Sequence, residues 1–98
     1  MMFQEKNNVP NQAIKNVTTA GTAEPLSATS QVVKRLMIQA GDNSGNIYRG
    51  NSSVSSSAYA EVAPALNSFS VLNDVDLAEV YIDADNDGEG VSYSFEMY

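Results

Sequence analysis

The stretch VSYSFEMY, residues 91–98, alternates apolar and polar side chains more regularly than any other part of the chain. Successive side chains of a β-strand point to opposite faces of a sheet, so the alternation predicts a strand. The side chains on one face are Val91, Tyr93, Phe95 and Met97. Those on the other face are Ser92, Ser94, Glu96 and Tyr98. The first face is expected to lie in a hydrophobic core.

A second alternating stretch, EVYIDA at residues 79–84, places Val80, Ile82 and Ala84 on one side. An acidic segment rich in Asp, Asn and Gly separates the two stretches, and these residue types favour tight turns. The sequence therefore predicts a hairpin of these two strands. Its connection would take positive φ angles at Asn86, Asp87, Gly88 and Gly90.

A third candidate strand, VVKRLMIQA at residues 32–40, is apolar on both sides. Strict alternation groups Val32, Leu36, Ile38 and Ala40 with Lys34 on one face. Val33 and Met37 then lie on the opposite face, beside Arg35 and Gln39. A strand that is apolar on both faces is often covered on both, so Val33 and Met37 are expected to contact a partner or a second subunit.

Shorter β-branched and aromatic clusters lie between turn-forming segments elsewhere in the chain. They are IKNVTTA (14–20), AEPL (23–26), NIYRG (46–50), AEVA (60–63) and SFSVL (68–72). DVDLAEV (74–80) can hold one helical turn capped by Asp74 or Asp76. The expected fold is all-β: a small antiparallel β-sandwich of about eight short strands, with a jelly roll as the suggested arrangement. One domain, residues 14–98, would contain it.

Residues 1–13, MMFQEKNNVPNQA, show no sustained period and are expected to form an extended N-terminal arm. Met1, Met2, Phe3 and Val9 are apolar side chains that the arm could bury against a partner. The alternative is a frayed terminus without a binding role.

The composition excludes many kinds of chemistry. The 98 residues include 5 basic and 12 acidic side chains, no histidine and no cysteine, which gives a formal charge of −7. Serine or cysteine nucleophiles paired with histidine cannot be built, nor can a zinc site with His or Cys ligands. We expect no enzymatic activity. The acidic charge argues against nucleic acid and anionic membranes as partners, and neither an apolar span of about 18 residues nor a signal peptide is recognisable.

The acidic segment DADNDGEG, residues 83–90, has two interpretations. Asp83, Asp85 and Asp87, followed by a glycine, match the first half of an EF-hand calcium loop, but position 12 falls on Ser94. A non-helical calcium turn could use Asp83, Asp85, Asp87 and Glu89. The favoured interpretation is a solvated turn without a metal, so no cofactor is expected, and Ca²⁺ remains the alternative.

Several ordered motifs resemble a group of small virion structural proteins of tailed bacteriophages. They are TAGTAEPLSATSQVVKRLMIQAG, SGNIYRGNSSVSSS, APALNSFSV and DLAEVYIDADNDGEGVSYSF, which together span Thr19 to Phe95. The chain departs from the group's pattern at Arg49, where a small apolar residue is usual, and at residues 63–68, which replace a glycine turn. These departures concern loops more than the fold.

The resemblance implies a capsid decoration (cement) protein that binds the outside of the shell and stabilises contacts between major capsid subunits. The major capsid protein would be its partner, and it would be made in the host cytoplasm and reside on the virion surface. Alternatives are a neck or tail adaptor, or a carbohydrate- or receptor-binding module that uses the five tyrosines. We expect a homo-oligomer, a dimer or trimer on the shell, with Phe95, Met97 and Tyr98 at the contact.

Overall fold

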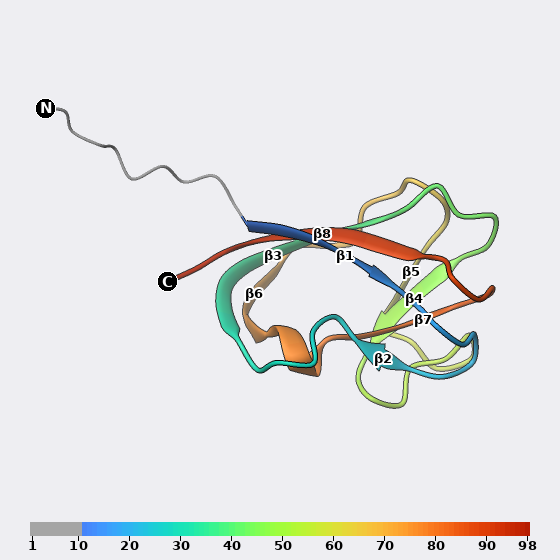
Figure 1. The fold of residues 1–98 in the computed structure, drawn as a ribbon, viewed down its shortest axis with the longest axis horizontal. Coiled ribbons are helices and arrows are strands. Elements are labelled where there is room, and N and C mark those ends of the chain that lie inside the picture. The colour runs from blue at the N-terminus through green and yellow to red at the C-terminus, as the bar shows by residue number, and fades with distance from the viewer. Residues whose placement is uncertain (1–10) are drawn as a thin grey trace, which may run out of the picture.

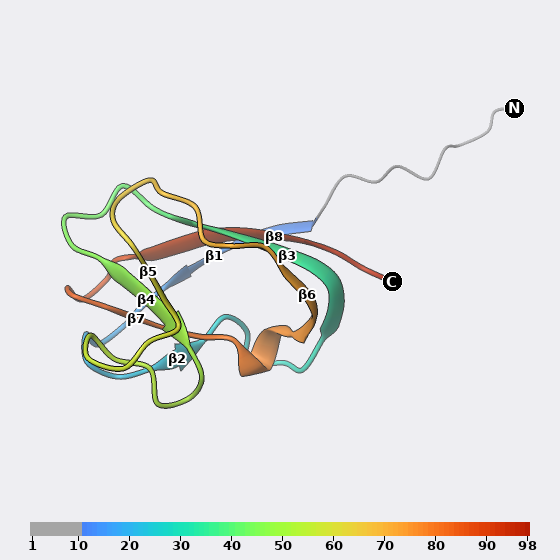
Figure 2. The same ribbon diagram turned by 180° about the vertical axis from the view of Figure 1, so that it is seen from behind.

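The computed structural model describes residues 11–98, and the arrangement of this part of the chain is drawn in Figures 1 and 2. The elements are β1 (Asn11–Asn16), β2 (Glu24–Pro25), β3 (Val32–Ala40), β4 (Ile47–Gly50), β5 (Glu61–Ala63), β6 (Leu72–Asp76), the 3-10 turn η1 (Leu77–Glu79), β7 (Tyr81–Ala84) and β8 (Gly90–Glu96). The expected helical turn is present, and Asp76 caps it by accepting a hydrogen bond from the N–H of Ala78 at 2.9 Å.

The strands form two antiparallel sheets of four strands each. Sheet A has the order β1-β8-β3-β6, and sheet B has the order β2-β7-β4-β5. Within these sheets β1 pairs with β8, β2 with β7, β3 with β6 and β4 with β5. This is the pairing of one long hairpin wrapped into two layers, which is the jelly-roll arrangement of a β-sandwich. The predicted all-β sandwich is confirmed, and its strand order is now defined.

The expected hairpin of residues 79–84 with residues 91–98 is wrong. β7 belongs to sheet B and β8 to sheet A, so the acidic connection passes from one layer to the other. Turn-forming residues indicate where the chain changes direction, but they do not indicate the strand with which β7 or β8 pairs. Within residues 11–98, β4 and β5 are the one pair of strands that follow each other in the chain and also lie in the same sheet.

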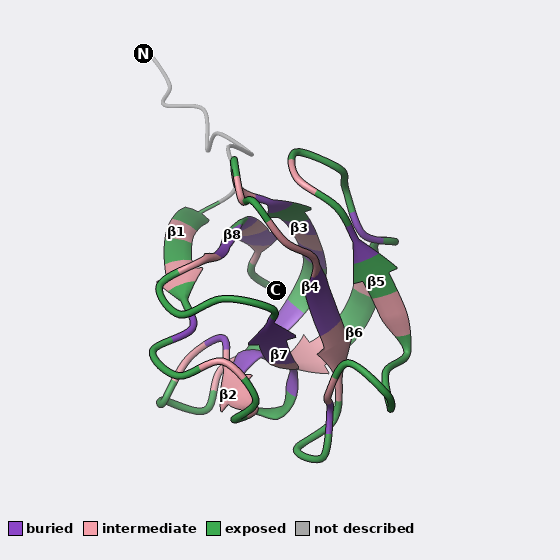
Figure 3. Cartoon of the chain, turned by 90° about the vertical axis from the view of Figure 1, so that its right-hand side faces the viewer, coloured by how far each residue is buried: buried purple, intermediate pink, exposed green. Residues whose placement is uncertain are grey.

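The core lies between the two layers, where the buried residues of Figure 3 face one another. Val91, Tyr93 and Phe95 of β8 are buried there, as their alternation predicts, whereas Met97 lies beyond the strand end and is exposed. Phe95 is only 9% exposed, so it packs in the core and is not available as the partner contact that we expected.

The alternation of β3 changes phase along the strand. Val33 and Leu36 are both fully buried, although strict alternation puts them on opposite faces, and Val32 is 54% exposed. Residues 32–36 pair with β6 and residues 35–40 with β8, and Asp74 stands opposite Lys34 with a positive φ of 54°. Lys34 and Arg35 are both exposed, so the side-chain alternation shifts by one position there. Val33 therefore faces the core, and its predicted partner role is wrong.

Two predicted boundaries also need correction. Asn11, Gln12 and Ala13 already pair with β8, so β1 begins inside the predicted arm of residues 1–13. The expected strand 68–72 lies earlier than β6, which begins at Leu72 and carries the polar sequence LNDVD. Pairing with β3 holds this polar segment extended, a tertiary effect that local propensity cannot reveal.

Candidate functional site

The acidic connection before β8 uses its carboxylates to fasten neighbouring loops. Asp83 is buried, and its Oδ1 accepts hydrogen bonds from the backbone N–H groups of Gly21 and Ala84 at 2.9 and 2.8 Å. Asp87 Oδ1 accepts a hydrogen bond from the N–H of Ala20 at 2.7 Å. Both carboxylates therefore hold the loop between β1 and β2.

Asp85 and Glu89 hold the loop between β3 and β4. Asp85 accepts hydrogen bonds from the N–H of Asn46 and the hydroxyl of Tyr48, both at 2.8 Å. Glu89 accepts hydrogen bonds from the N–H and the hydroxyl of Ser44 and from the N–H of Gly45. These bonds, those from Ser44 above all, lower the pKa of Glu89 to about 2.

The four carboxylates thus serve separate donors instead of converging on one point. Within residues 11–98, no group of three acidic side chains is placed to hold a metal ion. This arrangement favours the turn interpretation over the calcium turn. Of the four predicted positive-φ residues, Gly88 alone has one, at 82°. Gly90 is instead required by close packing, since a Cβ there would overlap the carbonyl oxygen of Lys15.

The tyrosines do not gather into one face. Tyr93 is in the core, and its hydroxyl donates a hydrogen bond to the carbonyl of Leu26. Tyr48 is buried and packs against the exposed Tyr59, with ring centroids 5.2 Å apart. Tyr98 is exposed beyond the end of β8 in the other sheet. A sugar-binding row of tyrosines is therefore not formed.

A hollow of about 690 Å³ lies on the outer face of sheet A, a volume within the usual range of ligand pockets. We call it the outer-face hollow. Its outward-pointing residues on the three paired strands are Gln12 and Ile14 of β1, Ser92 and Ser94 of β8, and Met37 and Gln39 of β3. Ser68 and Val71, from the segment before β6, complete this outer lining.

The register explains why the face is hollowed. Ser92 stands between Ile14 and Gln39, and Ser94 stands between Gln12 and Met37. The central strand thus contributes two small side chains, and both neighbouring strands contribute longer ones. The alternation that buries Tyr93 on the inner face places these two serines outward, so one pattern produces both the core and the floor of the hollow.

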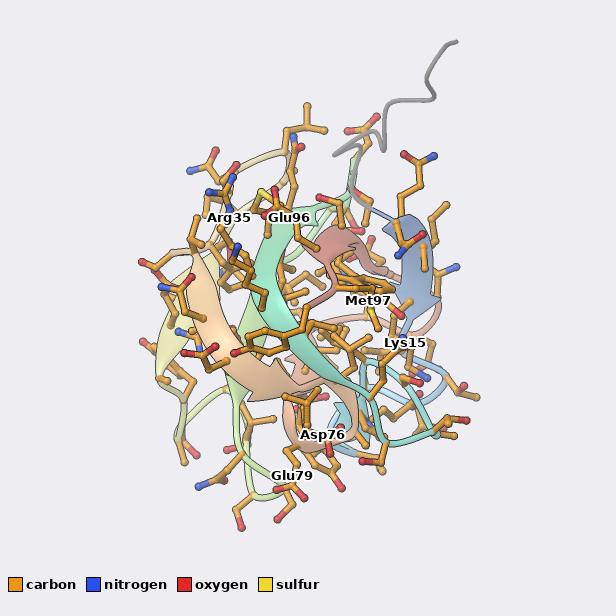
Figure 4. All side chains as sticks on the ribbon, turned by 90° about the vertical axis from the view of Figure 1, so that its left-hand side faces the viewer. Lys15, Arg35, Asp76, Glu79, Glu96 and Met97 are labelled. Carbon is orange, nitrogen blue, oxygen red and sulfur yellow. The ribbon has the colours of Figure 1, made fainter. Side chains whose placement is uncertain are left out.

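Among residues 11–98, no charged side chain lines the outer-face hollow, although the chain has a formal charge of −7. A weak ion pair stands beside it, between Arg35 Nη2 and Glu96 Oε2 at 3.6 Å, and Figure 4 shows these two side chains together. Within residues 11–98, the hydroxyls of Ser92 and Ser94 make no hydrogen bond. The described lining therefore combines two hydroxyl groups with an absence of charged side chains.

Exposed apolar side chains border the hollow. Ile14 is 74% exposed and Val71 is 51% exposed. Leu66 is 58% exposed and has a positive φ of 67°, which is unfavourable for a residue with a Cβ. Gln39, which lines the hollow, donates a hydrogen bond to the carbonyl of Leu66 at 3.0 Å and helps to fix this loop.

The hollow includes one of the predicted partner residues, Met37, which is half-buried. Met97 and Tyr98 are exposed at the end of β8, and Met97 accepts a contact from the side-chain amide of Gln31 at 3.2 Å. Met1, Met2, Phe3 and Val9 lie outside the described residues. The remaining lining residues were missed, because cross-strand neighbours cannot be read from one sequence.

No protein-family model, no curated protein and no solved structure matches this chain. In residues 11–98 no helix has the length and apolar character needed to cross a membrane.

Proposed function

We propose that this protein is a capsid decoration (cement) protein of a tailed phage, which binds the outer shell and stabilises contacts between major capsid subunits. The observation that carries the proposal is the uncharged outer-face hollow on an otherwise acidic domain. Depletion of charge with exposed apolar side chains is typical of the centre of a protein–protein contact. The phage-like motifs supply the kind of particle, and jelly rolls are frequent in viral capsids, which is an analogy of fold.

The side-chain chemistry supports binding instead of catalysis. The chain has no histidine or cysteine, and the acidic side chains of the connection before β8 are engaged as hydrogen-bond acceptors for nearby loops. Within residues 11–98, no histidine or carboxylate lines the hollow beside the hydroxyls of Ser92 and Ser94. These residue types fit a surface that binds a partner without catalysing a reaction on it.

A shell protein needs only modest affinity at each contact, because many copies act together. Apolar burial contributes about 25 cal/mol per Å², so a face with Ile14, Met37 and Val71 supplies a limited contact energy at each site. Repetition over a shell multiplies such contacts through effective concentration. The proposed role is therefore compatible with a single small hollow.

The test uses shells that lack the protein, to which purified variants are added back. Ile14→Asp places a charge in the outer-face hollow at a residue that is already 74% exposed. We expect at least about a tenfold loss of shell affinity, the effect of removing one contact of about 1.4 kcal/mol. Val62→Asp is the matched control, because Val62 is exposed on β5 of the other sheet. Equal binding by the two variants would remove the hollow from the proposal.

A neck or tail adaptor is the nearest alternative, and it uses the same kind of surface. It differs in copy number, since an adaptor is present in a few copies and a decoration protein in many. A carbohydrate-binding role has less support, because the tyrosines are dispersed over the two sheets.

A further inference from the structure

We infer that residues 1–10 of one copy occupy the outer-face hollow of a second copy, so that neighbouring molecules are linked by exchanged arms. The inference deepens the proposed function, since it names the occupant of the same surface and assumes copies that lie side by side. The same exchange of arms is expected of the purified protein in the absence of a shell.

The point at which residues 1–10 join the domain supports exchange. Asn11 and Gln12 are already strand residues, paired with Phe95 and Ser94, and Gln12 lines the hollow. That pairing places the junction with residues 1–10 at the start of β1, beside the lining of the hollow. Val9 precedes Pro10, and a residue in that position favours extended conformations. An arm that continued the direction of β1 beyond Asn11 would lead away from its own hollow and toward a neighbouring copy.

The arm is long enough to reach a neighbour. A fully extended chain spans at most about 3.3 to 3.6 Å per residue, so ten residues cover roughly 33 Å. The outward-pointing lining of the hollow occupies two alternate positions on each of β1, β8 and β3. Only part of the arm is needed to fill it, and the remainder can bridge the two domains.

The chemistry of the arm matches the lining of the hollow. The arm carries the apolar residues Met1, Met2, Phe3 and Val9 and the amides Gln4, Asn7 and Asn8. The hollow presents apolar side chains at Ile14, Met37 and Val71 beside the hydroxyls of Ser92 and Ser94. An aromatic ring from Phe3 can also contact the thioether of Met37, which is a favourable pairing.

The distribution of charge favours this contact between two copies. Lys6 and Glu5 cancel, so the arm has no net charge, and the remaining 4 basic and 11 acidic side chains leave −7 on residues 11–98. Two acidic domains repel one another if they approach directly. An arm without net side-chain charge, placed on a lining without charged side chains, would join the copies while their acidic loops stay apart.

The experiment measures self-association of the full chain by sedimentation over a wide concentration range. Phe3→Asp damages the arm, and Ser94→Arg fills the floor of the hollow from an outward position on β8. Each variant alone should associate at least about tenfold more weakly than the unmodified chain. An equimolar mixture of the two should regain association, because an intact arm from one can enter the intact hollow of the other.

Val62→Arg serves as the control, since it adds the same charge on β5 of the other sheet. A chain that stays monomeric at every concentration would overturn the inference, as would variants that associate like the unmodified chain. A mixture that regains nothing would show that each arm contacts only its own domain. These outcomes leave the decoration role in place, because shell binding is measured separately with Ile14→Asp and Val62→Asp.

Discussion

Glu89 Oε2 accepts hydrogen bonds from both the backbone N–H and the hydroxyl of Ser44, at 2.8 and 2.7 Å, although the two residues are 45 positions apart. Glu89 precedes β8 of sheet A, and Ser44 lies in the loop that leads from β3 of sheet A to β4 of sheet B. The contact therefore fastens two inter-sheet connections to one another. The acidic segment that resembles half a calcium loop therefore holds two connections together. We call the contact between Glu89 and Ser44 the clasp.

The clasp predicts an acid-sensitive contribution to stability. The pKa of Glu89 is lowered from 4.5 to about 2 by its bonds to Ser44, so the folded state favours the carboxylate. Its contribution is present above pH 4.5 and is lost as the pH falls toward 2. We expect the unfolding free energies of the native chain and Glu89→Gln to differ at pH 6 and to converge by about pH 2, as measured by urea denaturation. Glu79→Gln removes an equal charge from an exposed side chain, and a similar pattern there would contradict a specific role of Glu89.

Gly90 is predicted to tolerate no side chain. A Cβ at this position would overlap the carbonyl oxygen of Lys15 and lie 2.6 Å from the Cα of Asn16, both backbone atoms of β1. Gly90→Ala should cost at least about 3 kcal/mol, the upper end of overpacking effects, and should increase hydrogen exchange in β1. Gly88→Ala meets no atom within 4 Å and only opposes a φ of 82°, so it should cost about 1 kcal/mol. Equal losses in the two variants would show that β1 adjusts.

Two ion pairs of the same residue types should differ in their contribution to stability. Glu61 accepts hydrogen bonds from Arg49 at 3.1 Å and from the N–H and hydroxyl of Ser70, and the Arg49 side chain is 15% exposed. Removing it leaves a largely buried guanidinium unpaired, so Glu61→Ala should cost about 2 kcal/mol. Glu96→Ala breaks the exposed contact with Arg35 at 3.6 Å and should cost less than about 0.5 kcal/mol. The comparison requires only thermal or urea unfolding, and equal costs would contradict it.

Calcium is predicted to have little effect on the folded state. The carboxylates of Asp83, Asp85, Asp87 and Glu89 each serve donors in nearby loops, so binding an ion would break existing hydrogen bonds. We expect the melting temperature in 1 mM Ca²⁺, about the concentration that occupies weak extracellular sites, to match that in an equal concentration of Mg²⁺. A calcium-specific increase that disappears in Asp85→Asn would instead support a metal site.

The local elements of this fold were predictable wherever alternation is strong. The bounds of β3 and the inner face of β8 follow directly from VVKRLMIQA and VSYSFEMY, and the cap of η1 is the second of the two predicted candidates, Asp74 and Asp76. β6 was misplaced because its sequence is polar and pairing with β3 holds it extended. Val33 was assigned to the wrong face because the strand turns over opposite Asp74.

The outer-face hollow could not be predicted, because it depends on which strands are neighbours. Ile14 and Met37 lie on either side of β8 only after β1 and β3 have both paired with it. The sequence contains the small side chains of the floor as SYS, residues 92–94, but their meaning depends on the longer residues across the sheet. Once the strand order of a jelly roll is known, a strand with alternating serines therefore indicates a hollow on the outer face of its sheet.

The most direct test of the proposed function is the number of copies of this protein in purified particles of the proposed phage. Quantitative mass spectrometry against the major capsid protein gives this ratio without any assumption about the binding site. A decoration protein with repeated shell contacts predicts a copy number close to that of the major capsid protein. A handful of copies per particle, or none, would contradict the account.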